Sequence, residues 1–135
     1  GIIHDIGYAS ALFNSGLHAV DGALHALSSG VPERICNLVA HHSCARVEAD
    51  LRGISHSLAG WRDEGGPVRD ALWWADMTTG PDGGLVDVWD RIAEVQERYG
   101  PEDVVTKFIR QAESELVAAV ERTEVRIREV LGVVR

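Results

Sequence analysis

The sequence predicts an all-helical fold with a long C-terminal helix. Apolar residues recur at steps of three and four in several segments, and no segment shows the apolar–polar alternation of a half-buried strand. Glycine and proline separate these segments, as in Gly66-Pro67 and Gly100-Pro101, where the proline suits the first turn of a helix. The 135 residues are enough for one domain with a single core. We therefore expect one compact helical bundle over residues 1–135.

Residues that start and stop helices divide the chain. Gly7 is expected to take the left-handed conformation that ends a first helix, which would carry His4 and Asp5 on its last turn. Pro32 opens a later helix, because proline fits the first helical turn. Asp87 is expected to cap another. In chain order, helices are expected over residues 1–7, 17–28, 32–42, 45–51, 67–77, 88–98 and 101–131.

Two loops and a long apolar stripe complete the predicted architecture. Residues 55–66 are rich in glycine, serine and charge, so we expect a loop there, with Trp61 folded back on the core. A second loop is expected over residues 79–84. Earlier in the chain, residues 14–16 are expected to interrupt helical structure before the helix at 17–28. The last helix carries a stripe of Val105, Ile109, Ala112, Leu116, Val120, Thr123, Ile127 and Leu131. Its length predicts a helix that projects beyond a small core.

Composition excludes some classes of function. The formal net charge is −8 and Lys107 is the single lysine, whereas binding a nucleic-acid backbone needs clustered cations. No apolar run reaches the length of a membrane span and no charged-then-apolar leader opens the chain, so we expect a cytoplasmic protein.

Cys36 and Cys44 are interpreted as reduced, partly buried thiols. A structural zinc site of Cys36, His41, His42 and Cys44 is a much weaker alternative.

Histidine and aspartate recur along the first part of the chain. In order, the set is His4, Asp5, His18, His41, His42 and Asp76. Divalent transition metals accept imidazole and carboxylate ligands, so the ordered set predicts a metal site, whereas a single His-Asp pair would mean little. A carboxylate can bridge two cations through its two oxygens, and each histidine supplies one nitrogen. Taken singly, each residue also has a common structural role.

Asp76 has an argument of its own. It lies four residues after Leu72 and three after Trp73, on the side of the helix that apolar residues imply is buried. A buried carboxylate needs a partner, and a metal is a strong one.

The roles of other polar residues near this set stay open. Asp21 and His25 share a helical face with His18, and we expect Asp21 to orient His18 or to assist proton transfer. Arg46 is a candidate phosphate contact, or equally a surface arginine. His56 is expected to be solvated.

The ordered set and its flanking residues resemble the HD-domain superfamily of metal-dependent phosphohydrolases. The resemblance covers residues 1–79, and the stretches 4–8, 40–43 and 75–83 are similar to a group of small bacterial HD proteins. It implies a helical core that binds one or two metals. By position, it implies that Asp5 bridges the metals, that His4 and Asp76 hold one of them, and that His18, His41 and His42 hold the other.

The chain departs from this family in two places. The family also uses a histidine on a helix before the His-Asp pair, and this chain has three residues there. We therefore expect the chain to lack that helix. Either the sequence is a fragment of a longer protein, or another chain or solvent supplies the ligand, or the domain has lost part of its site. Tyr8 stands where the cyclic-dinucleotide-cleaving branch has lysine, which argues against that branch.

The resemblance and the ligand set predict a phosphohydrolase. We expect a metal-activated water to cleave a phosphate ester or anhydride of a nucleotide or related small metabolite, with Asp5 as the bridging residue. The nitrogen-rich set favours one or two ions of iron, manganese or zinc type. The alternative is a non-catalytic helical module with a structural metal or an empty site, acting in self-association or regulation as a homodimer through the C-terminal helix.

Overall fold

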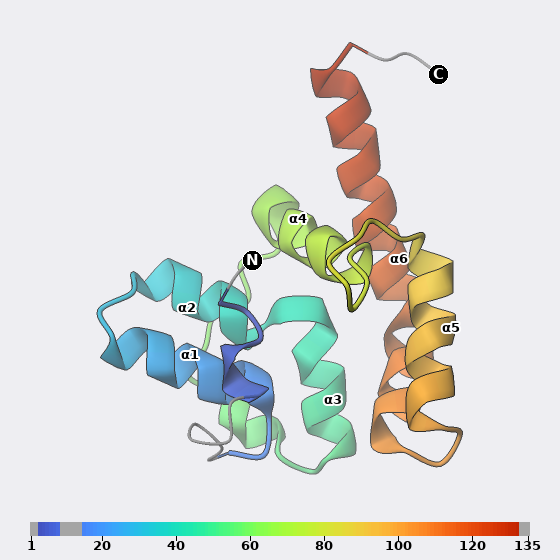
Figure 1. Cartoon of the computed structure of the whole chain (residues 1–135). Helices are drawn as coiled ribbons and strands as arrows, with labels where there is room; N and C mark the ends of the chain where they lie inside the picture. The colour runs from blue at the N-terminus through green and yellow to red at the C-terminus, as the bar shows by residue number, and fades with distance from the viewer. Residues whose placement is uncertain (1–2, 9–14, 133–135) are drawn as a thin grey trace. The chain divides into compact units, whose positions relative to one another are not determined.

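The computed structural model describes residues 3–8 and 15–132, and this part of the chain is all-α, as predicted. Its elements in order are η1 (Ile6–Tyr8), α1 (His18–Ser28), α2 (Glu33–Ala40), η3 (His42–Cys44), α3 (Ala45–Leu51), η4 (Ser55–Leu58), α4 (Gly66–Met77), α5 (Val88–Tyr99) and α6 (Val104–Val130), where η marks a 3₁₀ helix. Figure 1 shows these helices with the chain coloured from blue to red. Extended pairing within the described ranges is limited to an isolated bridge between Thr79 and Leu85.

The chain divides into two compact units, Gly1–Glu64 and Gly65–Arg135. The boundary falls in the segment 55–66 that was predicted to be a loop, and the first part of that segment forms η4. The interpretation of residues 1–135 as one domain stays a prediction. A break was expected at residues 14–16: Asn14 lies outside the described residues, and Ser15 and Gly16 form bends before α1.

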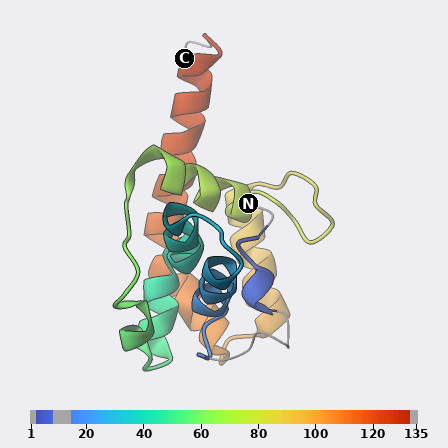
Figure 2. The same cartoon turned by 90° about the vertical axis from the view of Figure 1, so that its left-hand side faces the viewer.

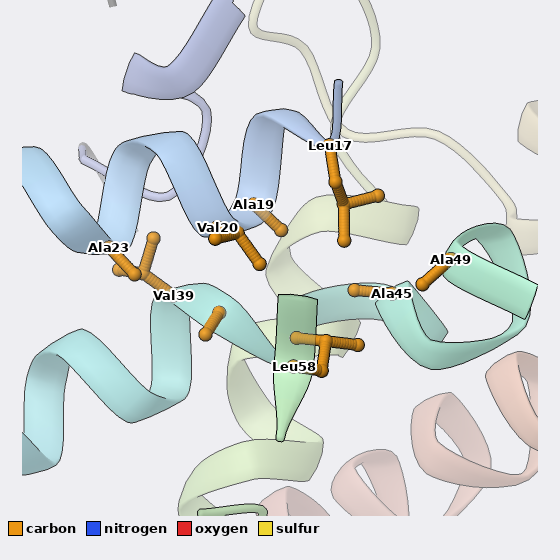
Figure 3. Packing of buried hydrophobic residues seen from close by; sticks show 9 residues of the cluster. Leu17, Ala19, Val20, Ala23, Val39, Ala45, Ala49 and Leu58 are labelled. Atoms are coloured by element: carbon orange, nitrogen blue, oxygen red, sulfur yellow. The ribbon is translucent and has the colours of Figure 1, made fainter. Parts of the chain in front are cut away.

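The first unit is built around the packing of α1 on α2. Its buried cluster consists of Leu17, Ala19, Val20, Ala23, Val39, Ala40, Ala45, Ala49 and Leu58, most of which are labelled in Figure 3. Trp61 packs against this cluster, as the sequence predicted. The inner face of α1 is rich in alanine, while Leu24 and Leu27 are exposed. Small side chains let neighbouring segments approach the helix closely, which matters for the turn that carries His4 and Asp5.

The predicted first helix is wrong over the described residues. Residues 3–5 form a turn, η1 follows, and Gly7 is not in the left-handed region. Gly7 serves a different purpose: a Cβ there would overlap the carbonyl oxygen of His18 and lie 2.7 Å from the backbone nitrogen of Gly22. Figures 1 and 2 both show the dark-blue η1 lying against α1. Only a glycine allows the two backbones to come this close.

The chain turns sharply just after the histidine pair. α2 ends at Ala40, and not at the predicted residue 42. Ser43 and Cys44 then take left-handed conformations with φ of 47° and 58°. Non-glycine residues rarely adopt such angles, which cost of order 1–3 kcal/mol each where they occur. They let α3 start at Ala45, so that the buried His42 lies between the end of α2 and the start of α3.

In the second unit, α6 packs against both α4 and α5. Asp87 caps α5 as predicted, because its side chain accepts hydrogen bonds from the backbone of Trp89 and Asp90. The start predicted for the last helix at Pro101 is wrong. α6 begins at Val104, and the side chain of Asp103 caps it by accepting the amide hydrogen of Val105.

A buried carboxylate joins α4 to α6. Asp70 is 2% exposed and accepts hydrogen bonds at 2.8 Å and 2.9 Å from Arg122 and at 2.8 Å from Arg126. The hydrogen bond from Arg122 lowers the pKa of Asp70, burial opposes it, and the bond from Arg126 lowers it further, to about 2. The two guanidinium groups therefore keep Asp70 ionised inside the unit.

The apolar stripe of α6 is buried in its first part and exposed in its last. Ile109, Ala112, Leu116, Val120 and Thr123 are buried, so this part of the stripe faces the core. Ile127 and Leu131 are exposed, which agrees with a helix that extends past its neighbours α4 and α5 (Figure 1). Among the described residues, no helix combines the length and the apolar character that crossing a membrane requires.

We predict that Gly7→Ala destabilises the first unit by about 2 kcal/mol or more, because the new methyl group overlaps backbone atoms of α1 that cannot move aside. Urea unfolding followed by circular dichroism measures the change. Gly60→Ala is the matched control, because a Cβ at Gly60 meets nothing within 4 Å and its φ is ordinary. Equal stability of the Gly7 and Gly60 variants would contradict the close approach of η1 to α1.

We predict that Asp70→Asn lowers the free energy of unfolding by about 2 kcal/mol at neutral pH, because Arg122 and Arg126 lose their ionic partner. The loss is not larger because both arginines are half-exposed and can bind water instead. The pKa of Asp70 is about 2 in the folded chain, against an ordinary value of 3.8, so the stabilisation is full above pH 3.8 and is lost as the pH falls toward 2. The stability difference between wild type and variant, measured from pH 2 to 7, checks this. Glu64→Gln, in the Arg34–Glu64 pair at the surface, should lower the free energy of unfolding far less than Asp70→Asn.

Candidate metal centre

Three ligand atoms from separate segments of the first unit face one another. Oδ1 of Asp5, in the turn before η1, lies 3.5 Å from Nε2 of His18 at the start of α1. The same oxygen lies 3.4 Å from Nε2 of His42, and the two histidine nitrogens are 3.2 Å apart. The sequence predicted all three residues as metal ligands, and the structure brings them together.

The spacing of these atoms fits a single divalent cation. Ligand atoms bound at about 2.1 Å to one ion, at tetrahedral or octahedral angles, lie about 3.0–3.4 Å from one another. The three distances of 3.2, 3.4 and 3.5 Å are close to this range. An imidazole nitrogen pair with one carboxylate oxygen is a donor set that transition metals accept, so these residues can hold such an ion.

A backbone hydrogen bond sets the tautomer of His42. Its Nδ1 lies 2.7 Å from the carbonyl oxygen of Val39, which can only accept. Nδ1 therefore carries a proton, and in the neutral ring Nε2 presents its lone pair toward Asp5 and His18. Metal-binding histidines commonly donate their other N–H to a backbone carbonyl in this way. His42 is 3% exposed, so its ring is held in this orientation by packing as well.

His4 approaches the other oxygen of Asp5. Its Nε2 lies 3.1 Å from Oδ2, while Oδ1 faces His18 and His42. The two oxygens of one carboxylate are thus directed at different histidines, an arrangement that suits a bridging ligand. The edge of the His4 ring also contacts the ring of His42, with centroids 4.9 Å apart.

The surrounding histidines control the charge of Asp5. Burial raises the pKa of this carboxyl, but the hydrogen bonds from His18 and His4 outweigh that effect and hold the pKa far below its usual range. Asp5 is therefore ionised at neutral pH, the state in which a carboxylate binds metals. Its side chain is 48% exposed, so solvent or a small molecule reaches the oxygens.

His41 points to a different partner from His42. Its Nε2 lies 2.8 Å from the carbonyl oxygen of Trp61, to which it donates a hydrogen bond. The ring therefore links the end of α2 to the segment that follows η4, and a metal would have to bind His41 through Nδ1. The structure does not bring His41 into the group of Asp5, His18 and His42, and its role as a ligand stays a prediction.

Asp76 belongs to the second unit, where it lies half-buried in the last turn of α4. Trp73, on the same side of the helix, is buried as the sequence argument required. The fully buried carboxylate of α4 is Asp70, which lies three residues before Trp73 and so on the same stripe. That spacing was visible in the sequence. The role of Asp76 as a ligand stays a prediction.

The remaining polar residues occupy varied positions. Oδ1 of Asp21 accepts the backbone N–H of Ser15 at 2.7 Å, so this buried carboxylate holds the entry to α1. Arg46 is exposed on α3, and His56 is exposed within η4, as expected for a solvated side chain. His25 is half-buried on α1. The proposed catalytic role of Asp21 and phosphate role of Arg46 stay predictions.

Cys36 and Cys44 are both buried and unbridged, which agrees with the interpretation as thiols. The Sγ of Cys36 donates to the carbonyl oxygen of Val31. Burial raises the pKa of the Cys36 thiol, which disfavours the thiolate that zinc binding requires. The groups of ligand atoms found in the described ranges contain histidine and aspartate and neither cysteine.

Two contributors to the centre were not identified from the sequence. The carbonyl of Val39 orients His42, and nothing in the side-chain pattern marks a backbone acceptor. Tyr8 stacks on the ring of His18, with centroids 3.8 Å apart and planes 11° from parallel. Its position three residues after Asp5 was the available signal, because a turn brings such residues onto one side.

Comparison with known proteins identifies no relative of this chain: no family model, no curated protein and no solved structure matches it.

Proposed function

We propose that this chain is an HD-type metal-dependent phosphohydrolase that cleaves a phosphate ester or anhydride of a nucleotide or related small metabolite. The observation that carries the proposal is the mutual approach of Asp5, His18 and His42 at distances that suit one cation. The resemblance to the HD superfamily supplies the reaction class. One or two ions of iron, manganese or zinc type are the proposed cofactors.

The ligand set favours a catalytic site over a purely structural one. Structural zinc sites are usually closed by four protein ligands, whereas catalytic sites keep a position open for water or substrate. Here Asp5 is half-exposed while His18 and His42 are largely buried, so the group is open on the side of its carboxylate. A divalent ion bound there would supply the activation of water and the polarisation of a phosphate group.

The chain's own residues would keep this group in one arrangement. The Val39 carbonyl fixes the His42 ring, and the N–H of Tyr8 donates to the carbonyl of Asp5 at 3.1 Å, which closes the turn. The low pKa of Asp5 keeps both oxygens charged. With His4 facing Oδ2, Asp5 is the proposed bridging residue if two ions bind. By the resemblance, Asp76 is then the proposed second ligand of the ion at His4.

We predict that the chelator-stripped protein takes up Mn²⁺, Fe²⁺ or Zn²⁺, and that Asp5→Ala or His42→Ala weakens uptake by about tenfold or more. Elemental analysis after reloading and calorimetric titration measure the stoichiometry and affinity. His56→Ala is the matched control, because His56 is an exposed histidine of the same unit. A wild-type protein that carries no transition metal after reloading would sink the proposal.

The same titration separates the two adjacent histidines. Since Nε2 of His41 bonds to Trp61, we expect His41→Ala to lower the stability of the first unit by about 1 kcal/mol. A loss of metal affinity as large as that of His42→Ala would establish His41 as a ligand through Nδ1. Unchanged affinity would remove it from the ligand set and leave a structural role.

We predict hydrolysis of mononucleotides, dinucleoside polyphosphates or aryl phosphates in the presence of Mn²⁺ or Fe²⁺. Chelation should abolish turnover and metal addition should restore it, while Asp5→Ala should reduce it more than about 100-fold. Asp76→Asn, compared with Asp90→Asn on α5 as a control, tests the proposed ligand of the second unit. Metal uptake without turnover of any of these compounds would favour a non-catalytic module.

A second candidate function is self-association through the end of α6. The supporting observation is that Val125, Ile127, Val130 and Leu131 are all exposed near the C-terminal end of α6. An apolar helix end of this kind suits pairing with another helix. Sedimentation velocity of the wild type and of Ile127→Ser distinguishes a dimer from a monomer.

A further inference from the structure

Tyr8 presents an aromatic ring beside the candidate metal centre. It belongs to the same closed turn as Asp5, and its ring lies nearly parallel to that of His18 at a centroid distance of 3.8 Å. The residue is nevertheless 64% exposed. Single exposed tyrosines are common on protein surfaces, but this one is fixed by a backbone hydrogen bond and by stacking on a residue of the ligand set.

We propose that Tyr8 selects substrates that carry an aromatic ring, by stacking on a nucleobase while the phosphate lies at the open side of Asp5. The inference rests on the proposed function, which it makes specific. His18, Tyr8 and the base would form a stack of three rings. Aromatic side chains bind bases in this way without sequence preference, because every base has a flat face.

The spacing of this stack suits a nucleoside monophosphate. The rings of Tyr8 and His18 are 3.8 Å apart, so a base stacked on the outer face of Tyr8 would lie at about twice that distance from His18. In a nucleoside 5′-monophosphate, a ribose separates the base from the phosphate over a similar length. A backbone hydrogen bond closes the turn that joins Tyr8 to Asp5, so both ends of the substrate would meet groups already in place.

Two comparisons of ligand binding test this role. The probes are adenosine monophosphate and ribose 5-phosphate, titrated into Zn²⁺-loaded protein by calorimetry, because both carry the same phosphate and sugar but only one carries a base. The wild type should bind the nucleotide more tightly. Tyr8→Ala should reduce the ratio of the two affinities by about tenfold, while Tyr8→Phe should retain that ratio.

Tyr99→Ala is the matched control, since Tyr99 is an exposed tyrosine at the end of α5. Equal affinity of the wild type for both probes, or no binding of the nucleotide, would overturn the proposal. So would a Tyr8→Ala variant that loses both probes equally, because Tyr8 would then act only by supporting His18. Metal content of each variant, measured in parallel, identifies that case directly.

Phosphate release in the same samples judges hydrolysis separately. Preferential binding of the nucleotide without phosphate release would support the stacking role of Tyr8 and count against the phosphohydrolase. Phosphate release from both probes at equal rates, with equal affinities, would support the phosphohydrolase and count against the stacking role of Tyr8. The two proposals therefore fail in different measurements.

Discussion

Backbone packing between the turn at residues 3–8 and the first turns of α1 sets the geometry of the candidate metal centre. Gly7 and Gly22 are both so close to the opposite backbone that a methyl group on either would press against it. This approach brings Asp5 within 3.5 Å of His18, although thirteen residues separate them in the sequence. The position of the carboxylate thus depends on the absence of two side chains.

The second constraint is the route of the chain around His42. The left-handed residues Ser43 and Cys44 end one helix and start the next within a few residues, and the carbonyl of Val39 then fixes the imidazole. Strained backbone persists only where the surrounding structure enforces it, and such strain is concentrated at functional sites. At this place it keeps a buried histidine aimed at Asp5, and the neighbouring His41 aimed at Trp61.

Asp5 and Asp70 illustrate two ways to keep a carboxylate charged within a small protein. Asp70 is buried and bonded by Arg122 and Arg126, whose charges are permanent, so its oxygens are committed to joining α4 and α6. Asp5 is half-exposed and surrounded by histidines, whose neutral rings can bind a metal. The residues around each carboxylate therefore decide its role: arginines give Asp70 a structural role, and histidines make Asp5 available for chemistry.

The amino-acid pattern by itself determined the helical class, most helix boundaries and the cap at Asp87, because apolar periodicity and helix-end chemistry act over a few residues. It also singled out Asp5, His18 and His42. It did not determine that residues 3–8 form a turn and a 3₁₀ helix, that Asp103 replaces Pro101 at the start of α6, or that Tyr8 stacks on His18. Those outcomes depend on contacts between distant segments, so only the tertiary structure decided them.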